Sequence, residues 1–141
     1  MKAKEYLSQA YKLNNLIDSK LLQLEKSKSL MYGISSISKS SERVSGGKAT
    51  SDRLGDIVSK TIDLEEEINK TIDNYVDIQR EITAMIEAVE NPIYRVLLTY
   101  RYLDFLTWEK IAKRIGYSYV HTVHRLHPKA LAAVEEILKG V

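Results

Sequence analysis

The chain has 141 residues, of which 44% are hydrophobic, and its formal net charge is +2. These values are typical of one or two small globular units with a modest packed core. Cysteine is absent, which excludes disulfide bonds and thiolate metal sites, and no apolar run reaches the roughly 20 residues that cross a membrane. We therefore expect a cytoplasmic protein with no membrane partner.

The charges are segregated along the chain. Lysine and arginine exceed aspartate and glutamate by 10 to 5 in residues 1–53, are outnumbered by 3 to 10 in residues 54–90, and exceed them again by 8 to 4 in residues 91–141. This alternation predicts internal or intersubunit pairing between the basic first segment and the acidic middle. It also predicts that the basic last segment faces phosphates.

Residues 5 to about 32 have the periodicity of one long amphipathic helix. Its apolar positions recur with spacings of three and four: Leu7, Ala10, Ile17, Leu21, Leu24 and Met31. Residues 33–53 are instead rich in serine and glycine and hold only isolated apolar residues, which predicts a mobile loop.

Residues 54–89 are the most regular segment. Heptad positions a and d are occupied by Leu54, Ile57, Thr61, Leu64, Ile68, Thr71, Tyr75, Ile78, Ile82, Met85 and Val89. A helix of this length, about 54 Å, needs partners to cover its apolar seam. We expect it to form a coiled-coil-like antiparallel hairpin with the first helix, so that residues 1–90 are one domain for oligomerisation or partner binding.

The seam is wider than one hairpin requires, because Val58, Ile72 and Ile86 flank it. We therefore predict a homo-oligomer, a dimer first of all, held through Leu54, Ile57, Leu64, Ile68, Tyr75, Ile78 and Ile82. The acidic cluster Asp63, Glu65, Glu66 and Glu67 points around the helix, so a solvated face or a face that pairs with lysines is expected rather than a metal site.

Asn91-Pro92 marks the start of a second domain, residues 91–141. Asparagine suits the N-cap and proline the first position of a helix. The buried stripe of that helix is predicted to be Ile93, Val96, Leu97, Tyr100 and Leu103.

Residues 107–131 have the pattern of a helix-turn-helix, which gives this domain three helices and the whole chain an all-α class. Thr107 can cap a helix whose Trp108, Ile111, Ala112 and Ile115 share one face. Gly116 can end it with positive φ, and Ser118 can cap the next helix after a short turn.

The second helix, about residues 118–129, divides into two sides at 100° per residue. Its predicted buried side holds Val120, Val123, Leu126, His127, Ala130 and Leu131. The opposite side holds Ser118, His121, Thr122, Arg125 and Lys129 without a carboxylate, and with Tyr119 these are the expected DNA contacts. Arg125 is predicted to reach furthest into the major groove, whereas Lys110, Lys113 and Arg114 of the preceding helix are predicted to meet phosphates.

Pro128 removes one backbone donor from this segment. Either the second helix kinks there, or it ends and a new helix begins with Pro128 in its first turn. The apolar residues beyond Leu126 then pack either on the same domain or on a partner.

Several short motifs together carry a family resemblance: Arg101-Tyr102, Trp108-Glu-Lys-Ile-Ala, Gly-Tyr-Ser, Val-His-Arg-Leu-His and Ala130-Leu131. Residues 92–138 resemble the region 4 helix-turn-helix of bacterial sigma factors, and most of all small phage and prophage proteins of that superfamily. The resemblance implies promoter binding, in some relatives as late-transcription regulators. One departure is that the sigma-type motif has six positions from the turn glycine to the buried valine, whereas Gly116 to Val123 is seven. A turn or helix start one residue longer is therefore expected, and a longer turn could rotate the second helix so that Thr122 or His121 takes the central place instead of Arg125.

No catalytic constellation is present, and we expect neither enzymatic activity nor a cofactor. His121, His124 and His127 fan across the helix, so a metal site is not expected. The favoured function is a phage transcription regulator that reads double-stranded DNA through residues 118–129 and dimerises, or contacts RNA polymerase, through residues 1–90. The alternatives are a DNA-packaging recognition subunit and a polymerase-binding adaptor that does not read DNA.

Overall fold

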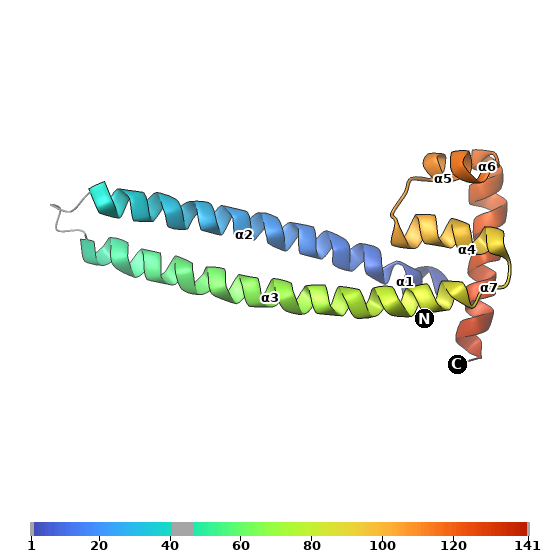
Figure 1. Cartoon of the computed structure of the whole chain (residues 1–141), viewed down its shortest axis with the longest axis horizontal. Helices are drawn as coiled ribbons and strands as arrows, with labels where there is room; N and C mark the ends of the chain where they lie inside the picture. The colour runs from blue at the N-terminus through green and yellow to red at the C-terminus, as the bar shows by residue number, and fades with distance from the viewer. Residues whose placement is uncertain (1, 41–46, 141) are drawn as a thin grey trace. The chain divides into compact units, whose positions relative to one another are not determined.

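The computed structural model describes residues 2–40 and 47–140, and these residues contain helices and no strand (Figure 1). The predicted all-α class is confirmed. The α-helices are α1 (Ala3–Leu7), α2 (Gln9–Ser40), α3 (Gly47–Glu87), α4 (Pro92–Leu98), α5 (Trp108–Ile115), α6 (Tyr119–His121) and α7 (His127–Lys139). Two π-helical segments, η1 (Thr99–Leu103) and η2 (Thr122–Leu126), follow α4 and α6. Within the described ranges, no helix has the length and hydropathy needed to cross a membrane.

The chain forms two compact units. Unit 1 consists of Met1–Asn14 and Asn74–Val141, and unit 2 consists of Asn15–Asp73. The boundary expected at residues 90/91 lies inside unit 1. The reason is that Ile82, Ile86 and Val89, at the end of the long helix and just beyond it, are buried in the same apolar cluster as Leu97 and Leu98.

In unit 2, lysines of α2 pair with glutamates of α3. The Nζ atom of Lys20 lies 2.6 Å from Oε1 of Glu67, and that of Lys28 lies 3.6 Å from Oε1 of Glu65. The predicted pairing between the basic first segment and the acidic middle is thus confirmed at these two sites. At these two ion pairs the higher residue number on α2 is paired with the lower one on α3.

The heptad seam of α3 is covered along its length. All eleven predicted a and d residues, from Leu54 to Val89, are buried or half-buried. The seven proposed for oligomerisation are among them, and Ile68 and Ile82 are only 4% and 0% exposed within one chain. The seam is therefore occupied by the chain's own helices and is not a free surface for a second copy.

The predicted loop at residues 33–53 is wrong over most of its length. Helix α2 continues to Ser40, and α3 begins at Gly47. Residues 41–46 lie outside the described residues. Adding a residue to an existing helix requires no new nucleus, so two long flanking helices can extend into a serine-rich segment that would not start a helix alone.

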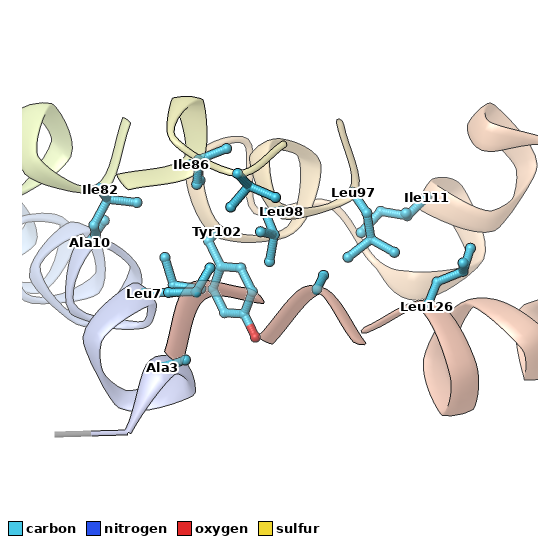
Figure 2. Packing of buried hydrophobic residues seen from close by; sticks show 13 residues of the cluster. Ala3, Leu7, Ala10, Ile82, Ile86, Leu97, Leu98, Tyr102, Ile111 and Leu126 are labelled. Carbon is cyan, nitrogen blue, oxygen red and sulfur yellow. The ribbon is translucent and has the colours of Figure 1, made fainter. Parts of the chain in front are cut away.

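The core of unit 1 joins both ends of the chain to the end of the long helix. Its thirteen buried members are Ala3, Leu7, Ala10, Ile82, Ile86, Val89, Leu97, Leu98, Tyr102, Ile111, Leu126, Ala130 and Val134. Figure 2 shows this cluster extending from Ile82 and Ala10 at one end to Ile111 and Leu126 at the other. The apolar residues after Leu126 therefore pack on the same domain, and the contacts of α7 with α1 and α4 account for their burial.

The buried face of α4 differs from the predicted stripe. Ile93 and Val96 are 36% and 42% exposed, whereas Leu97, Leu98 and Tyr102 are buried. Helix α4 contacts both α5 and α7, so two adjacent leucines are covered from different sides. The π-helical hydrogen bond from Asp104 N to Thr99 O then adds one residue to the following turn, which shifts the register of the segment that carries Tyr102.

Candidate nucleic-acid interface

The first helix of the predicted motif begins and ends where the sequence indicates. The Thr107 hydroxyl accepts a hydrogen bond from Lys110 N at 3.4 Å, which caps α5. Gly116 follows its last residue with φ 80°, a left-handed conformation, and donates its N–H to Ala112 O. Both predictions are confirmed, and the positive φ explains why glycine is preferred at this turn.

The next helix begins after a connection of three residues, Gly116 to Ser118. Ser118 has extended backbone geometry, and its hydroxyl accepts a hydrogen bond from His121 N at 3.1 Å. The predicted serine cap is confirmed. Since Tyr117 alone separates Gly116 from the cap, the connection between α5 and α6 is short and closed by hydrogen bonds.

The segment after Ser118 is helical throughout, but its hydrogen bonding changes twice. It is α-helical to His121, π-helical from Thr122 to Leu126, and α-helical again from His127, with Pro128 in the first turn of α7. Pro128 lies in the first turn of α7, which follows η2 directly. Leu126 keeps right-handed helical torsions, so the chain passes into α7 without a loop.

Thr122 is buried and does not belong to the solvent-facing surface. Its side chain is 0% exposed, and its hydroxyl donates to Ser118 O at 2.7 Å. The prediction that Thr122 contacts DNA is wrong for this physical reason. Threonine has nearly the shape of valine, and the local bond satisfies its hydroxyl, so it can take an apolar position. Thr122, as the buried residue, lies six positions after Gly116. The spacing therefore does not require a turn that is one residue longer.

Val120 is the converse case. The angular pattern predicts it on the buried side, but it is 65% exposed. The buried residues of the segment are Thr122, Leu126, Ala130 and Val134, four apart throughout. A uniform rotation of 100° per residue does not predict these buried positions, because η2 is π-helical. Its N–H groups bond to the fifth preceding carbonyl, as His127 N does to Thr122 O.

The remaining predicted contacts lie at the surface, with one exception. Ser118, Tyr119, Arg125 and Lys129 are exposed, as are Lys110, Lys113 and Arg114 of α5. His121 is half-buried and stacks on Tyr117, with ring centroids 5.1 Å apart. His124, which the helical projection assigned to neither side, is exposed beside Arg125.

The segment from Thr107 to Leu131 carries an excess of positive charge. From Thr107 to Leu131 the basic residues are Lys110, Lys113, Arg114, Arg125 and Lys129, and the only carboxylate is Glu109. None of the five is ion-paired within the part of the chain that the structure describes. The guanidinium of Arg114 lies 5.4 Å from the centre of the Tyr100 ring, and this cation–π contact helps to orient it.

The three histidines have different surroundings. His127 is half-buried, with Nε2 2.7 Å from the Tyr102 hydroxyl and its ring 4.5 Å from that of Trp108. Burial, and then the charges of Lys4 and Arg101, lower the pKa of His127 to about 4. Burial raises the pKa of Tyr102 to about 12, against a smaller opposing effect of Arg101. Both groups are therefore uncharged at neutral pH. Across the described residues, no three histidine, aspartate or glutamate side chains are placed to hold a metal ion together.

Comparison with known protein families gives one match, over residues 33–135, to a family described as "Protein of unknown function (DUF1492)". The match covers most of the chain, and the chain belongs to this family. No curated protein and no solved structure matches it.

Proposed function

We propose that this member of the DUF1492 family is a sequence-specific DNA-binding transcription regulator, in which α5 and the segment from α6 to α7 act as a helix-turn-helix. The observation that carries the proposal is the combination of a short, capped turn at Gly116 with five exposed cations and one carboxylate on the two helices that flank it, none of the cations being ion-paired within the described residues. Such a surface suits a polyanion, because each cation can replace a condensed counterion at a phosphate.

The exposed residues divide into two groups by position. Tyr119, Val120, His124 and Arg125 lie on the first two turns after the Ser118 cap, which is the part of a recognition helix that meets base edges. Lys110, Lys113 and Arg114 lie on the preceding helix, which crosses the backbone in this geometry and would contact phosphates. Lys129, further along, would also contact phosphate.

Arg125 is the residue proposed to read a base. Its guanidinium can donate two hydrogen bonds to one guanine, which is worth about 1 to 3 kcal/mol of discrimination. Sites selected from random duplex DNA by the full-length protein and by Arg125→Ala should differ at one base pair. Lys113→Ala should select the wild-type site and bind all sequences more weakly, with a salt dependence smaller by about one counterion. Lys70→Ala, an exposed lysine of unit 2, is the matched control for loss of charge.

The outcomes separate the proposal from its alternatives. An identical selected site for Arg125→Ala would remove that residue from base recognition. Failure of the wild-type protein to bind duplex DNA even at low salt would instead favour an adaptor that contacts RNA polymerase alone. Binding accompanied by a ring of many subunits would favour a DNA-packaging subunit.

We also infer that unit 2 is an antiparallel helical hairpin and that it mediates a homodimer, in keeping with a cytoplasmic regulator that acts on paired DNA sites. The dimer contact proposed here does not use the seam of α3, which the chain's own helices cover. It consists of large apolar side chains that α2 and α3 leave exposed: Leu16, Leu21, Leu22, Leu30, Tyr32 and Ile62. If these side chains gather on one face, they would form an apolar patch of the kind that marks an association surface.

A further inference from the structure

Unit 1 contains a cavity of about 400 Å³ beside the proposed DNA-binding segment. Four aromatic side chains line it, Tyr11, Tyr102, Phe105 and Trp108, together with Val123 and His127 of the second helix. Its size is at the lower end of the range for small-molecule sites. Tyr11 and Phe105 meet edge to face with ring centroids 5.5 Å apart, so their aromatic surfaces form one corner of the wall.

The charged residues of this cavity are both basic. Lys4 and Arg101 line it, and no aspartate or glutamate does. Arg101 is held in place, since its Nη1 donates to Leu106 O at 3.0 Å and its guanidinium lies 4.6 Å from the centre of the Trp108 ring. Neither cation is paired with a carboxylate among the residues that the structure describes. The cavity therefore offers positive charge at an aromatic wall without an internal counterion.

The backbone around the cavity is irregular in three places. Phe105 has φ 57°, the only positive value at a described residue other than glycine, and this conformation costs on the order of 1 kcal/mol. Both π-helical segments also reach the cavity, η1 through Arg101 and Tyr102 and η2 through Val123. Strained residues and π-helical turns of this kind concentrate at binding sites, where they orient side chains that a regular helix would place elsewhere.

We propose that this cavity binds a small aromatic anion, a planar ring system that carries a carboxylate, phosphate or sulfonate. The ring packs against the aromatic wall, and the anionic group meets Lys4 and Arg101. The occupant touches α5 through Thr107 and Trp108 and the second helix through Val123 and His127. Binding of this ligand does not depend on the DNA-binding proposal, since it uses other residues.

The probe pair is 8-anilinonaphthalene-1-sulfonate and its uncharged analogue N-phenyl-1-naphthylamine, titrated into the full-length protein. Trp108 is the only tryptophan of the chain and lines the cavity, so its quenching reports a probe bound nearby, and the variants below locate it. We expect saturable 1:1 quenching of Trp108 by the sulfonate. Lys4→Gln should weaken the sulfonate about tenfold, because a charge-assisted contact is lost, and should leave the uncharged analogue unchanged.

Two further variants keep the result interpretable. Tyr11→Ala removes part of the aromatic wall from a half-exposed position and should weaken both probes, whereas Tyr32→Ala, on exposed α2, should weaken neither. Lys26→Gln removes an exposed lysine of unit 2 and is the matched control for Lys4→Gln. Absence of quenching, or equal effects of Lys4→Gln and Lys26→Gln on the sulfonate, would overturn the proposal. Neither result depends on whether the protein binds DNA.

Discussion

Thr122 shows how one side chain decides which face of a helix is buried. Its hydroxyl donates to Ser118 O, and its own N–H donates to the same carbonyl at 2.9 Å. Thr122→Val should therefore leave no buried group unsatisfied, and we expect the free energy of unfolding to change by less than about 1 kcal/mol. Thr122→Lys would bury a charge and should cost about 3 kcal/mol or more. Urea denaturation of both variants measures these values.

DNA affinity provides the second measurement at this position. Because Thr122 does not reach the surface, Thr122→Val should bind DNA as the wild-type protein does. A loss of affinity without a loss of stability would mean that the hydroxyl faces DNA after all.

His127 should make the stability of unit 1 depend on pH. Its pKa is lowered to about 4 in the folded protein, against 6.5 when unfolded. As the pH falls below 6.5, the unfolded state takes up the proton first, so stability is lost between pH 6.5 and about 4 and then levels off. The ring is half-buried, and after discounting for solvent screening we expect a loss of about 1 to 2 kcal/mol.

The variant His127→Gln isolates this effect. Glutamine can still accept a hydrogen bond from the Tyr102 hydroxyl but does not titrate. Unfolding free energies at pH 7 and pH 4 should therefore differ less for the variant than for the wild-type protein, since carboxylates contribute equally to both. Equal pH dependence in the two proteins would show that His127 is not the responsible group.

At the scale of helices, the pairing in unit 2 can be tested by exchanging charges. Lys20→Glu places a second negative charge beside Glu67 and should destabilise the protein by about 0.5 to 1 kcal/mol. The double variant Lys20→Glu with Glu67→Lys should recover most of that loss. Lys28 and Glu65 are both about half-exposed and 3.6 Å apart, so the same exchange there should give a smaller coupling energy. No coupling at Lys20 and Glu67 would mean that the two helices are not in this register.

The elements that the sequence predicts well are those with local causes. Asn91, Thr107 and Ser118 each accept a hydrogen bond from a backbone N–H two or three residues on, and Gly116 adopts the φ that other residues avoid. These effects involve only neighbouring residues, so their signals are visible in the sequence. The heptad seam is similarly visible, because burial of α3 follows its apolar period.

The π-helical segments have no comparable local signal. A rotation of 100° per residue predicts that Val120 is buried and Thr122 exposed. The structure shows the opposite, because η2 adds one residue to the helical turn. Pro128, which removes a backbone donor just after η2, was the one indication that helical bonding changes in this region. The candidate surface was accordingly predictable in its charges and caps, and less so in its register.

For the whole molecule, the proposed dimer makes a prediction that distinguishes two apolar surfaces. Leu22 on α2 is 54% exposed, so Leu22→Asp should shift a dimer to monomer in sedimentation velocity at micromolar concentration while helix content by circular dichroism is unchanged. Ile68 is 4% exposed, so Ile68→Asp should unfold the protein instead. A wild-type protein that sediments as a single chain at these concentrations would refute the dimer.

The division into units could not be inferred from composition. Charge and heptad periodicity change near residue 90, which favours a boundary there, yet the core of unit 1 draws on residues from both sides of it. Contacts such as those between α1 and α7 leave no local pattern in the chain. The predicted domains are therefore two continuous stretches of the chain, whereas unit 1 combines two stretches that are distant in sequence.

The discontinuity of unit 1 has a consequence for biosynthesis. Unit 2 is a continuous stretch, Asn15–Asp73, and can form its contacts as soon as it leaves the ribosome. Ala3 and Leu7 must wait for Ala130 and Val134, which are translated more than a hundred residues later. Contacts of such long sequence separation form slowly, so the side of α1 that packs on α7 stays uncovered until α7 has been translated.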